Sequence, residues 1–227
     1  YIPYNREYSE YNFESVLKND YPHVRFKFFK LENQTRGAAE TIYLSLNQLN
    51  TENDTPVLCL DGDNFYECDV ITQWGGENCV FTMHDTTPRP IYSYVECNDS
   101  SNICDVKEKV KISDHACTGA YGFKSMPELK KFALEIIRDD DRQHSEFYMS
   151  GVIKRMLDGG TVFKNKSVDK SQFICLGTPL QVKQFYNNFP FVSSIQSTNR
   201  IQNKRVCFDL DNTLVTYPLV KGDYTSV

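Results

Sequence analysis

A short apolar run, Val57–Leu60, ends abruptly at the polar sequence Asp61-Gly62-Asp63-Asn64. Such a run is typical of a buried central strand that leaves its sheet in a turn. Because open α/β folds bind ligands at the carboxyl ends of their strands, the carboxylates of this turn are candidates for a Mg²⁺ site. A solvated turn produces the same sequence, so both interpretations stay open at this point.

Strand-like and helix-like patterns alternate along the rest of the chain. Further strands are predicted at residues 24–31, 78–84, 91–97, 103–110, 115–123 and 173–176, and helices at 9–18, 38–49, 125–137, 146–157 and from 179 onward. The helix at 125–137 is the best defined, because Ser125-Met126-Pro127-Glu128 is a capping box and apolar residues then recur at helical spacing. The alternation predicts an α/β fold, a Rossmann-like mixed sheet flanked by helices, with a β-rich section in its middle.

Charge and cysteine content narrow the classes of function. The 227 residues carry a net charge of −5 and no Lys/Arg-rich run, which argues against a protein that binds nucleic acid by neutralising its backbone. No apolar run approaches the ~20 residues of a membrane helix, so a membrane is not expected as a partner either. The eight cysteines contain no C-x-x-C pair. We expect free thiols and a cytoplasmic protein.

A second candidate site is the glycine-bearing sequence Gln34-Thr35-Arg36-Gly37, which precedes the helix predicted from Ala38. Backbone amides at a helix start can receive an anion or a base edge, and the Gln34 amide both donates and accepts hydrogen bonds. The same residues also make a plain helix start. The loop alone therefore does not decide between a binding site and a structural turn.

A third candidate is Glu108-Lys109, which lies on a predicted strand and is followed by the turn Thr118-Gly119-Ala120-Tyr121. These residues offer a cation, hydroxyl groups and backbone groups to a phosphorylated sugar. Exposed Glu-Lys pairs are more often plain surface, so this alternative stays open too. The four histidines show no metal-ligand spacing.

Taken in order, these segments resemble a known family. Residues 1–194 are similar to a sugar-phosphate nucleotidyltransferase of the glycosyltransferase-A type, which makes nucleoside diphosphate sugars from a nucleoside triphosphate and a sugar 1-phosphate. The matching signatures are Gln34 with Gly37-Ala38-Ala39-Glu40, then Leu60-Asp61-Gly62-Asp63-Asn64-Phe65, Glu108-Lys109, Thr118-Gly119-Ala120-Tyr121-Gly122-Phe123, Glu146-Phe147-Tyr148-Met149 and Leu176-Gly177-Thr178-Pro179. The resemblance implies the fold of the nucleotide-diphospho-sugar transferases.

The resemblance also implies a role for individual residues. The nucleotide would contact Gln34, Gly37 and Ala38, Asp63 would bind the catalytic Mg²⁺, and Lys109 would act as a catalytic residue that meets the sugar phosphate. The residues implied near the sugar phosphate are Glu108, Lys109, Gly119 and Glu146. A phosphate oxygen of the acceptor would attack the α-phosphorus, pyrophosphate would leave, and the product would serve the synthesis of surface glycans.

The chain departs from the family pattern at several positions. The N-terminal G-x-G-x-R loop that wraps the triphosphate has no counterpart, because residues 1–5 resemble the end of a later strand; we therefore expect a truncated domain with little activity of its own. Many relatives have an aspartate as a second metal ligand where Cys175 stands here. A thiol is a poor Mg²⁺ ligand, so either one carboxylate suffices or another, such as Asp61, assists. Val110 replaces the proline of the family's E-K-P.

A second resemblance follows a polar linker at residues 195–204. Residues 205–227 contain Val206-Cys207-Phe208-Asp209-Leu210-Asp211-Asn212-Thr213, which resembles the first motif of the haloacid-dehalogenase-like phosphatases. The resemblance implies that Asp209 is the nucleophile, that Asp211 is the general acid/base, and that both contribute to a metal site. These residues would be the first strand of a second, incomplete α/β domain.

The sequence is also compatible with two alternatives to nucleotidyl transfer. One is a sugar-phosphate phosphatase that works through the C-terminal domain. The other is a module that binds a nucleotide or a sugar phosphate without catalysis.

Overall fold

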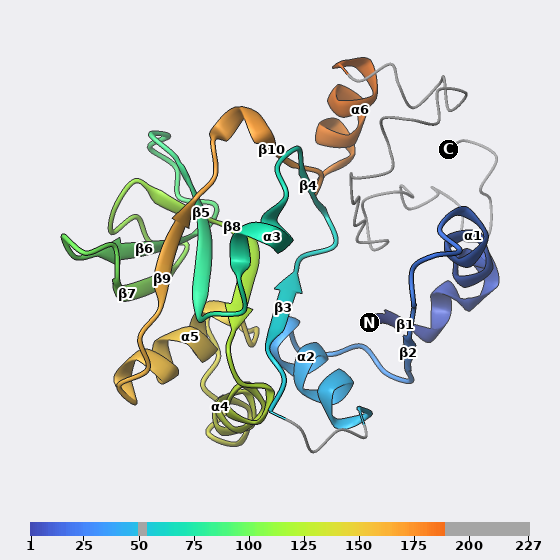
Figure 1. Cartoon of the computed structure of the whole chain (residues 1–227), viewed down its shortest axis with the longest axis horizontal. Helices are drawn as coiled ribbons and strands as arrows, with labels where there is room; N and C mark the ends of the chain where they lie inside the picture. The colour runs from blue at the N-terminus through green and yellow to red at the C-terminus, as the bar shows by residue number, and fades with distance from the viewer. Residues whose placement is uncertain (50–53, 189–227) are drawn as a thin grey trace. The chain divides into compact units, whose positions relative to one another are not determined.

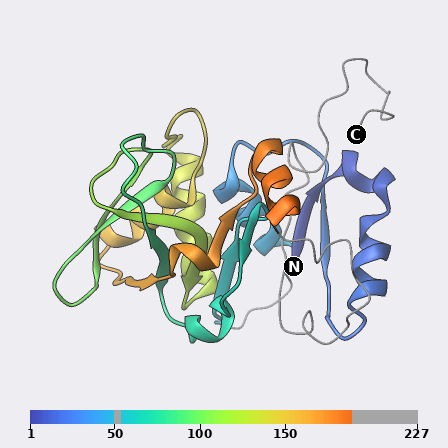
Figure 2. The ribbon, with the colours of Figure 1, turned by 90° about the horizontal axis from the view of Figure 1, so that it is seen from above.

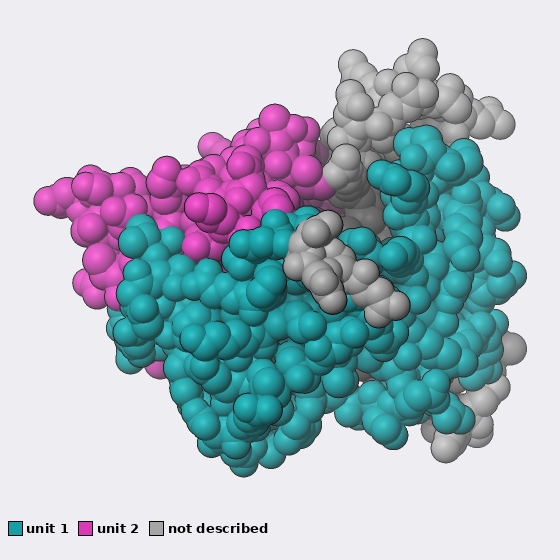
Figure 3. Space-filling model, turned by 60° about the horizontal axis from the view of Figure 1, so that its bottom comes forward, with its two compact units in different colours: residues 1–55, 105–108, 125–162 teal, residues 56–104, 109–124, 163–227 magenta. Residues whose placement is uncertain are grey.

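The computed structural model describes residues 1–49 and 54–188. The predicted linker and the motif with Asp209 and Asp211 lie outside the described residues. Two compact units make up the chain (Figure 3). Unit 1 comprises residues 1–55, 105–108 and 125–162, and unit 2 comprises residues 56–104, 109–124 and 163–227.

Unit 1 begins with a strand–helix–strand segment. It consists of β1 (Ile2–Asn5), the 3₁₀ helix η1 (Arg6–Tyr11), α1 (Phe13–Asp20) and β2 (Phe28–Leu31), and the two strands pair in parallel with α1 alongside (Figure 2). The Phe13 ring packs edge-on against Tyr4 and Phe28, which fixes α1 on the strands. The helix begins later than the predicted residue 9, because Asn12 adopts a left-handed conformation (φ 52°) that separates η1 from α1.

Unit 1 also contains three amphipathic helices, α2 (Ala38–Asn47), α4 (Met126–Arg138) and α5 (Met149–Asp158), with α2 and α5 each packed against α4. The predicted cap of α4 is present, since the Ser125 hydroxyl accepts a hydrogen bond from the Glu128 backbone at 3.3 Å. The Glu128 side chain does not complete a capping box, because it accepts a hydrogen bond from Thr161 instead. Helix α5 begins three residues after the predicted start at Glu146.

Unit 2 is built on a mixed sheet with the strand order β7-β6-β8-β5-β9, in which β3 also pairs with β8 (Figure 1). Its strands are β3 (Val57–Leu60), β5 (Cys79–His84), β6 (Ser93–Cys97), β7 (Ile103–Glu108), β8 (His115–Phe123) and β9 (Lys164–Ser167); the last four residues of β7 are counted with unit 1. Strands β3, β5 and β6 run antiparallel to β8, whereas β9 runs parallel to β5. This arrangement confirms the predicted α/β fold with a mixed sheet.

A smaller antiparallel pair joins β4 (Asn64–Tyr66) to β10 (Phe173–Cys175), and Asn64 lies opposite Cys175. Among its described residues, unit 2 also contains α3 (Val70–Trp74), the 3₁₀ helix η2 (Lys170–Gln172) and α6 (Pro179–Asn188). The core of unit 2 combines aromatic side chains, among them Phe81, Tyr94 and Phe173, with smaller apolar ones. The pairing of β4 with β10 brings the turn after β3 next to the predicted segment Gly177-Thr178-Pro179.

Two expectations from composition concern the described residues. The seven cysteines among them form no disulfide bond, as predicted for free thiols. A membrane-crossing helix is likewise missing from residues 1–49 and 54–188, since none of their helices is both long and apolar enough.

Candidate functional site

The turn that follows β3 is tied to the middle of β8. The backbone amide of Asp61 donates to the carbonyl of Gly119 at 2.8 Å, and the Asn64 side chain donates to the carbonyl of Thr118 at 3.1 Å. The Tyr66 hydroxyl donates to that same Thr118 carbonyl. These bonds hold the carboxylates of the turn at a fixed place on the sheet.

Gly119 makes this close approach of turn and strand possible. Its φ is +78°, and a Cβ at this position would lie 2.4 Å from Asp61 Oδ2 and 2.5 Å from Asn64 Nδ2. Gly119 lies in β8 between Cys117, which pairs with Thr82 of β5, and Tyr121, which pairs with Val80. The register between the two strands shifts in this stretch. Irregularities of this kind commonly re-aim groups next to binding sites. The structure therefore brings together two residues that the sequence marked separately, Asp61 and Gly119.

The carboxylate of Asp63 is the one in this turn that is best suited to bind a cation. It is half-buried, and this burial raises the pKa of its carboxyl above the usual range, while a hydrogen bond from its own backbone opposes the rise. In residues 1–49 and 54–188, no other residue donates a hydrogen bond to this carboxylate. A partly desolvated carboxylate without such a donor favours the binding of a cation.

The neighbours of Asp63 come from the loop after β10. A Cβ at Gly177 would lie 2.8 Å from Asp63 Oδ2 and 3.5 Å from the sulfur of Cys175, and the Leu176 amide donates to the Asp63 carbonyl at 2.6 Å. Burial, together with the charge of Asp63, raises the pKa of the Cys175 thiol. Cys175 thus stands beside Asp63, as the sequence pattern predicts, but as a neutral thiol.

The donor set near Asp63 determines which metal fits. The described part of the chain holds no group of three or more His, Cys, Asp or Glu side chains that could hold a metal ion. Such a group is not needed for Mg²⁺, which proteins often bind through one or two carboxylates while water and substrate phosphates fill the other positions. Asp63 therefore fits a Mg²⁺ ion shared with a substrate, whereas the Cys175 thiol does not add a suitable ligand.

Glu108 and Lys109 lie at the end of β7, where the chain turns sharply. Lys109 has a left-handed backbone (φ 51°), and its amide donates to the Tyr92 carbonyl at 3.0 Å. Glu108 is 8% exposed, whereas Lys109 is exposed. The neighbouring side chains are therefore in different environments, which is not the pattern of a plain surface Glu-Lys pair. Val110, at the position of the family's proline, is exposed as well.

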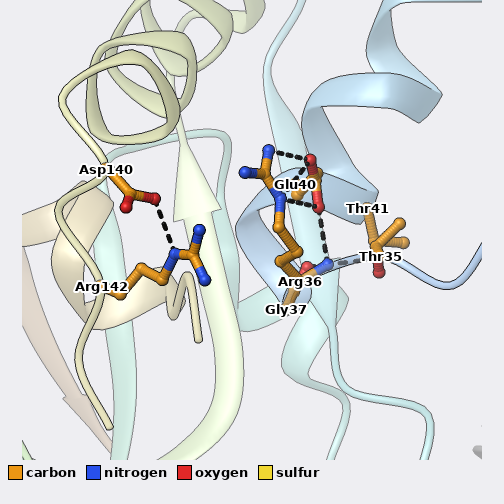
Figure 4. A network of polar contacts seen from close by, with 7 residues as sticks. All are labelled: Thr35, Arg36, Gly37, Glu40, Thr41, Asp140 and Arg142. Atoms are coloured by element: carbon orange, nitrogen blue, oxygen red, sulfur yellow. Dashed lines mark hydrogen bonds and ion pairs between the residues drawn. The ribbon is translucent and has the colours of Figure 1, made fainter. Parts of the chain in front are cut away.

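The glycine-bearing loop in unit 1 also has a specific backbone geometry. Gly37 has φ +132°, and a Cβ there would lie 2.7 Å from both the backbone nitrogen and the backbone oxygen of Phe147. The Arg36 amide donates to Glu40 at 2.6 Å, and the hydroxyls of Thr35 and Thr41 lie 2.6 Å apart (Figure 4). Gln34 and Ala38, on either side of this network, are exposed and thus accessible to a ligand.

The residues that hold Glu108 were not predicted from the sequence. The Ser150 hydroxyl donates to Glu108 Oε2 at 2.8 Å and lies 3.3 Å from Gln143 Oε1. Glu146, predicted to be helical, instead pairs through its backbone with Gln143 and is exposed. A serine in the first turn of a helix and a glutamine in a polar loop carry no signal of their own in the sequence.

The predicted residues thus gather in two groups. In unit 1 the loop with Gly37 is bonded to Phe147, which follows Glu146 directly, and Glu108 is bonded to Ser150. In unit 2, Gly119 lies against Asp61, and Asp63 lies beside Cys175.

Solved structures with a similar fold were found, although no protein-family model and no curated protein matches the sequence. A nucleoside-diphosphate-sugar pyrophosphorylase from Vibrio cholerae RC9 has a TM-score of 0.71 at 18% identity, over 82% of this chain and 79% of that one. An inositol-1-phosphate CTP transferase from T. maritima has a TM-score of 0.59 at 14% identity, over 86% and 76%.

A third structure is the CTP:phosphocholine cytidylyltransferase of Streptococcus pneumoniae, with a TM-score of 0.60 at 11% identity, over 83% of this chain and 78% of that one. Identities this low establish the fold alone. The mixed sheet of unit 2 and the helices of the chain agree with the fold implied by the sequence motifs. The chain therefore has the mixed α/β fold of the nucleotide-diphospho-sugar transferases.

Proposed function

We propose that this chain is part of an enzyme that transfers a nucleotidyl group from a nucleoside triphosphate to a sugar 1-phosphate or a similar phosphorylated acceptor. The observation that carries the proposal is the Asp63 carboxylate. It lies just beyond the end of β3, half-buried and without a hydrogen bond from another residue of the described ranges. The proteins with similar structures, a pyrophosphorylase and two CTP-dependent transferases, support the same class of reaction.

The proposed reaction is a phosphoryl substitution. An oxygen of the acceptor phosphate forms a bond to the α-phosphorus, the bond from that phosphorus to the bridging oxygen of the β-phosphate breaks, and pyrophosphate leaves. A Mg²⁺ ion held through Asp63 would offset the crowded negative charge and polarise a phosphoryl oxygen. The exposed ammonium group of Lys109 would supply a second positive charge to the phosphates.

Residues of unit 1 would bind the organic parts of the two substrates. The exposed residues Gln34 and Ala38, with Gly37 between them, would contact the nucleotide base. Glu108 and Glu146 would accept hydrogen bonds from hydroxyl groups of the acceptor, and Gly119 is a further residue proposed to bind it. The nucleotide sugar would be formed in the cytoplasm and would serve the synthesis of surface glycans.

The test is an assay of pyrophosphate release by the protein expressed from its full gene. It uses Mg²⁺, each common nucleoside triphosphate, and a panel of sugar 1-phosphates with phosphocholine added. We expect one pair of substrates to react and Asp63→Asn to reduce the rate at least a hundredfold, because it removes the carboxylate charge. Asp99→Asn, an exposed position in the turn after β6, is the matched control and should leave the rate unchanged. Absence of pyrophosphate with every pair would overturn the proposal.

The two alternatives from the sequence make different predictions in the same protein. If phosphatase activity dominates, Asp209→Asn should abolish phosphate release from sugar phosphates. If the chain is only a binding module, calorimetry should detect nucleotide or sugar phosphate binding without Mg²⁺, and no turnover should follow.

A further inference from the structure

A short hairpin lies between α4 and α5. The backbones of Gln143 and Glu146 exchange two hydrogen bonds, of 2.9 and 3.0 Å, and the residues between them, His144 and Ser145, both have left-handed backbones with φ of 48° and 76°. Left-handed conformations are uncommon for residues other than glycine, so two in succession indicate a turn that its surroundings hold in place. We refer to residues 143–147 as the 143–147 hairpin.

The last residue of this hairpin, Phe147, is bonded to the loop that the sequence assigns to the nucleotide. Its amide donates to the Arg36 carbonyl at 2.8 Å, and its carbonyl accepts from the Ala39 amide at 2.9 Å. Between these two bonds Gly37 approaches the Phe147 backbone so closely that no side chain fits there. The conformation of the loop at Gly37 therefore depends on Phe147 as well as on the bonds within the loop.

The side chain of Phe147 makes a second connection to the same loop. Its ring is fully buried, and the guanidinium carbons of Arg36 and Arg142 lie over it at 4.9 and 5.3 Å from the ring centre. Each arginine is oriented by a carboxylate, Arg36 by Glu40 and Arg142 by Asp140 (Figure 4). Guanidinium groups over an aromatic face are attracted to it. One ring thus receives a charged group from the nucleotide loop and another from the segment that leads into the hairpin.

The opposite end of the hairpin lies beside the carboxylate assigned to the acceptor. Gln143 Oε1 is 3.3 Å from the Ser150 hydroxyl, which donates to the buried Glu108 at 2.8 Å. Glu146, the other carboxylate assigned to the acceptor, is within the hairpin itself. The 143–147 hairpin is therefore in contact with the elements proposed to bind each of the two substrates.

We propose that Phe147 is a positioning residue that fixes the nucleotide loop relative to the acceptor carboxylates. Its backbone fixes the conformation of the loop at Gly37. Its ring holds the guanidinium groups of Arg36 and Arg142 in place and so supports this backbone contact. The inference rests on the proposed function, because it assigns the loop to the nucleotide and Glu108 and Glu146 to the acceptor. It adds a role for a buried residue that contacts neither substrate.

Phe147→Leu is the main test, because it removes the ring but keeps an apolar side chain and both backbone bonds. We expect KM for the nucleoside triphosphate and for the acceptor each to rise about five- to tenfold, the loss expected for two guanidinium–ring contacts, with kcat changed less than twofold. Phe163→Leu is the matched control: its ring is also fully buried but packs against Phe123 in unit 2. It should lower the melting temperature to a similar extent and leave both KM values unchanged.

A second variant covers the case in which Phe147→Leu does not fold. Arg142→Gln changes an exposed side chain and removes one guanidinium group from the ring, so we expect both KM values to rise about twofold to threefold. Arg138→Gln, an exposed arginine in the last turn of α4, is its control.

The outcomes separate this inference from the proposed function. If the wild-type protein reacts but the variants and their controls have the same KM values, Phe147 has only a structural role and the inference is wrong. If the wild-type protein neither binds a nucleoside triphosphate in calorimetry nor releases pyrophosphate, the proposed function fails first.

Discussion

Gly119 lies against the Asp61 carboxylate so closely that a Cβ on the glycine would be 2.4 Å from Asp61 Oδ2. Asn64 Nδ2 would lie at 2.5 Å and Asp61 Cβ, which cannot rotate away, at 2.9 Å, so the turn itself would have to shift. Because the turn with Asp61 and Asn64 also carries Asp63, the size of residue 119 determines where the proposed metal ligand lies.

Gly119→Ala should therefore impair both stability and activity. The left-handed backbone alone costs about 1–2 kcal/mol for a residue with a Cβ, and the clash adds to this cost. We expect a loss of at least about 3 kcal/mol in the free energy of unfolding and a large loss of pyrophosphate release, checked by urea denaturation and by the assay. Gly75→Ala is the control, since Gly75 has φ +67° but no atom within 4 Å of a Cβ. Equal losses in the two variants would contradict this prediction.

Gly37→Ala should act on the nucleotide loop of unit 1. The Cβ would lie 2.7 Å from backbone atoms of Phe147, which cannot rotate away as a flexible side chain can. We expect nucleotide affinity measured by calorimetry to fall at least tenfold. The control is Gly160→Ala, where φ is +87° and the space around a Cβ is open. It should cost about 1 kcal/mol of stability and leave nucleotide affinity unchanged.

Cys175→Asp should strengthen the binding of a divalent cation. The new carboxylate would stand beside Asp63 and offer oxygen ligands, which Mg²⁺ and Mn²⁺ prefer to a neutral thiol. We expect the dissociation constant for Mn²⁺, measured by electron paramagnetic resonance, to fall about tenfold or more. Cys175→Ser removes the thiol without adding charge and should leave this constant close to that of the wild type. A weaker Mn²⁺ affinity in the aspartate variant would show that residue 175 does not face the cation.

Asp85 should make the stability of unit 2 depend on pH. It is 1% exposed; burial raises the pKa of its carboxyl, but hydrogen bonds from Tyr94 and Thr87 outweigh burial, so the pKa lies below the usual value. Because the pKa is lower in the folded state, the ionised carboxylate stabilises the fold at pH values above 3.8, the pKa of the unfolded state. This contribution to stability is lost as the pH falls through the lower pKa of the folded state.

Asp85→Asn is the corresponding variant. We expect it to lower the free energy of unfolding by about 1–3 kcal/mol at pH 7, because it removes the charge that accepts these bonds, and by less near pH 3. Urea denaturation at the two pH values measures the difference. A loss that does not shrink at low pH would show that the charge of Asp85 is not what stabilises the fold.

Local patterns predicted those elements whose signals lie within one segment. Strand β8 and helix α4 were placed within a residue of their observed bounds, because β8 is almost continuously buried and α4 has both a serine cap and an apolar stripe. Strand β9 was missed because its sequence, Lys164–Ser167, is polar and becomes a strand only by pairing with β5.

The candidate site likewise contains residues that local patterns predict and residues whose roles depend on distant parts of the chain. The glycines at 37 and 119 stood out in the sequence, but the groups that make them necessary are far away along the chain: Phe147 for the first and Asp61 for the second. Glu146 was assigned to a helix because apolar spacing begins near it, and the pairing with Gln143 takes it out of that helix. Such pairings depend on tertiary contacts, which no local pattern contains.

Each unit of this chain is assembled from three separated stretches of sequence. An internal cut such as one after residue 104 leaves both units incomplete on each side. Neither unit can be obtained as a continuous fragment, so functions must be assigned by point substitutions in the intact chain. The same interleaving makes many native contacts distant in sequence, and a topology of this kind is expected to fold slowly.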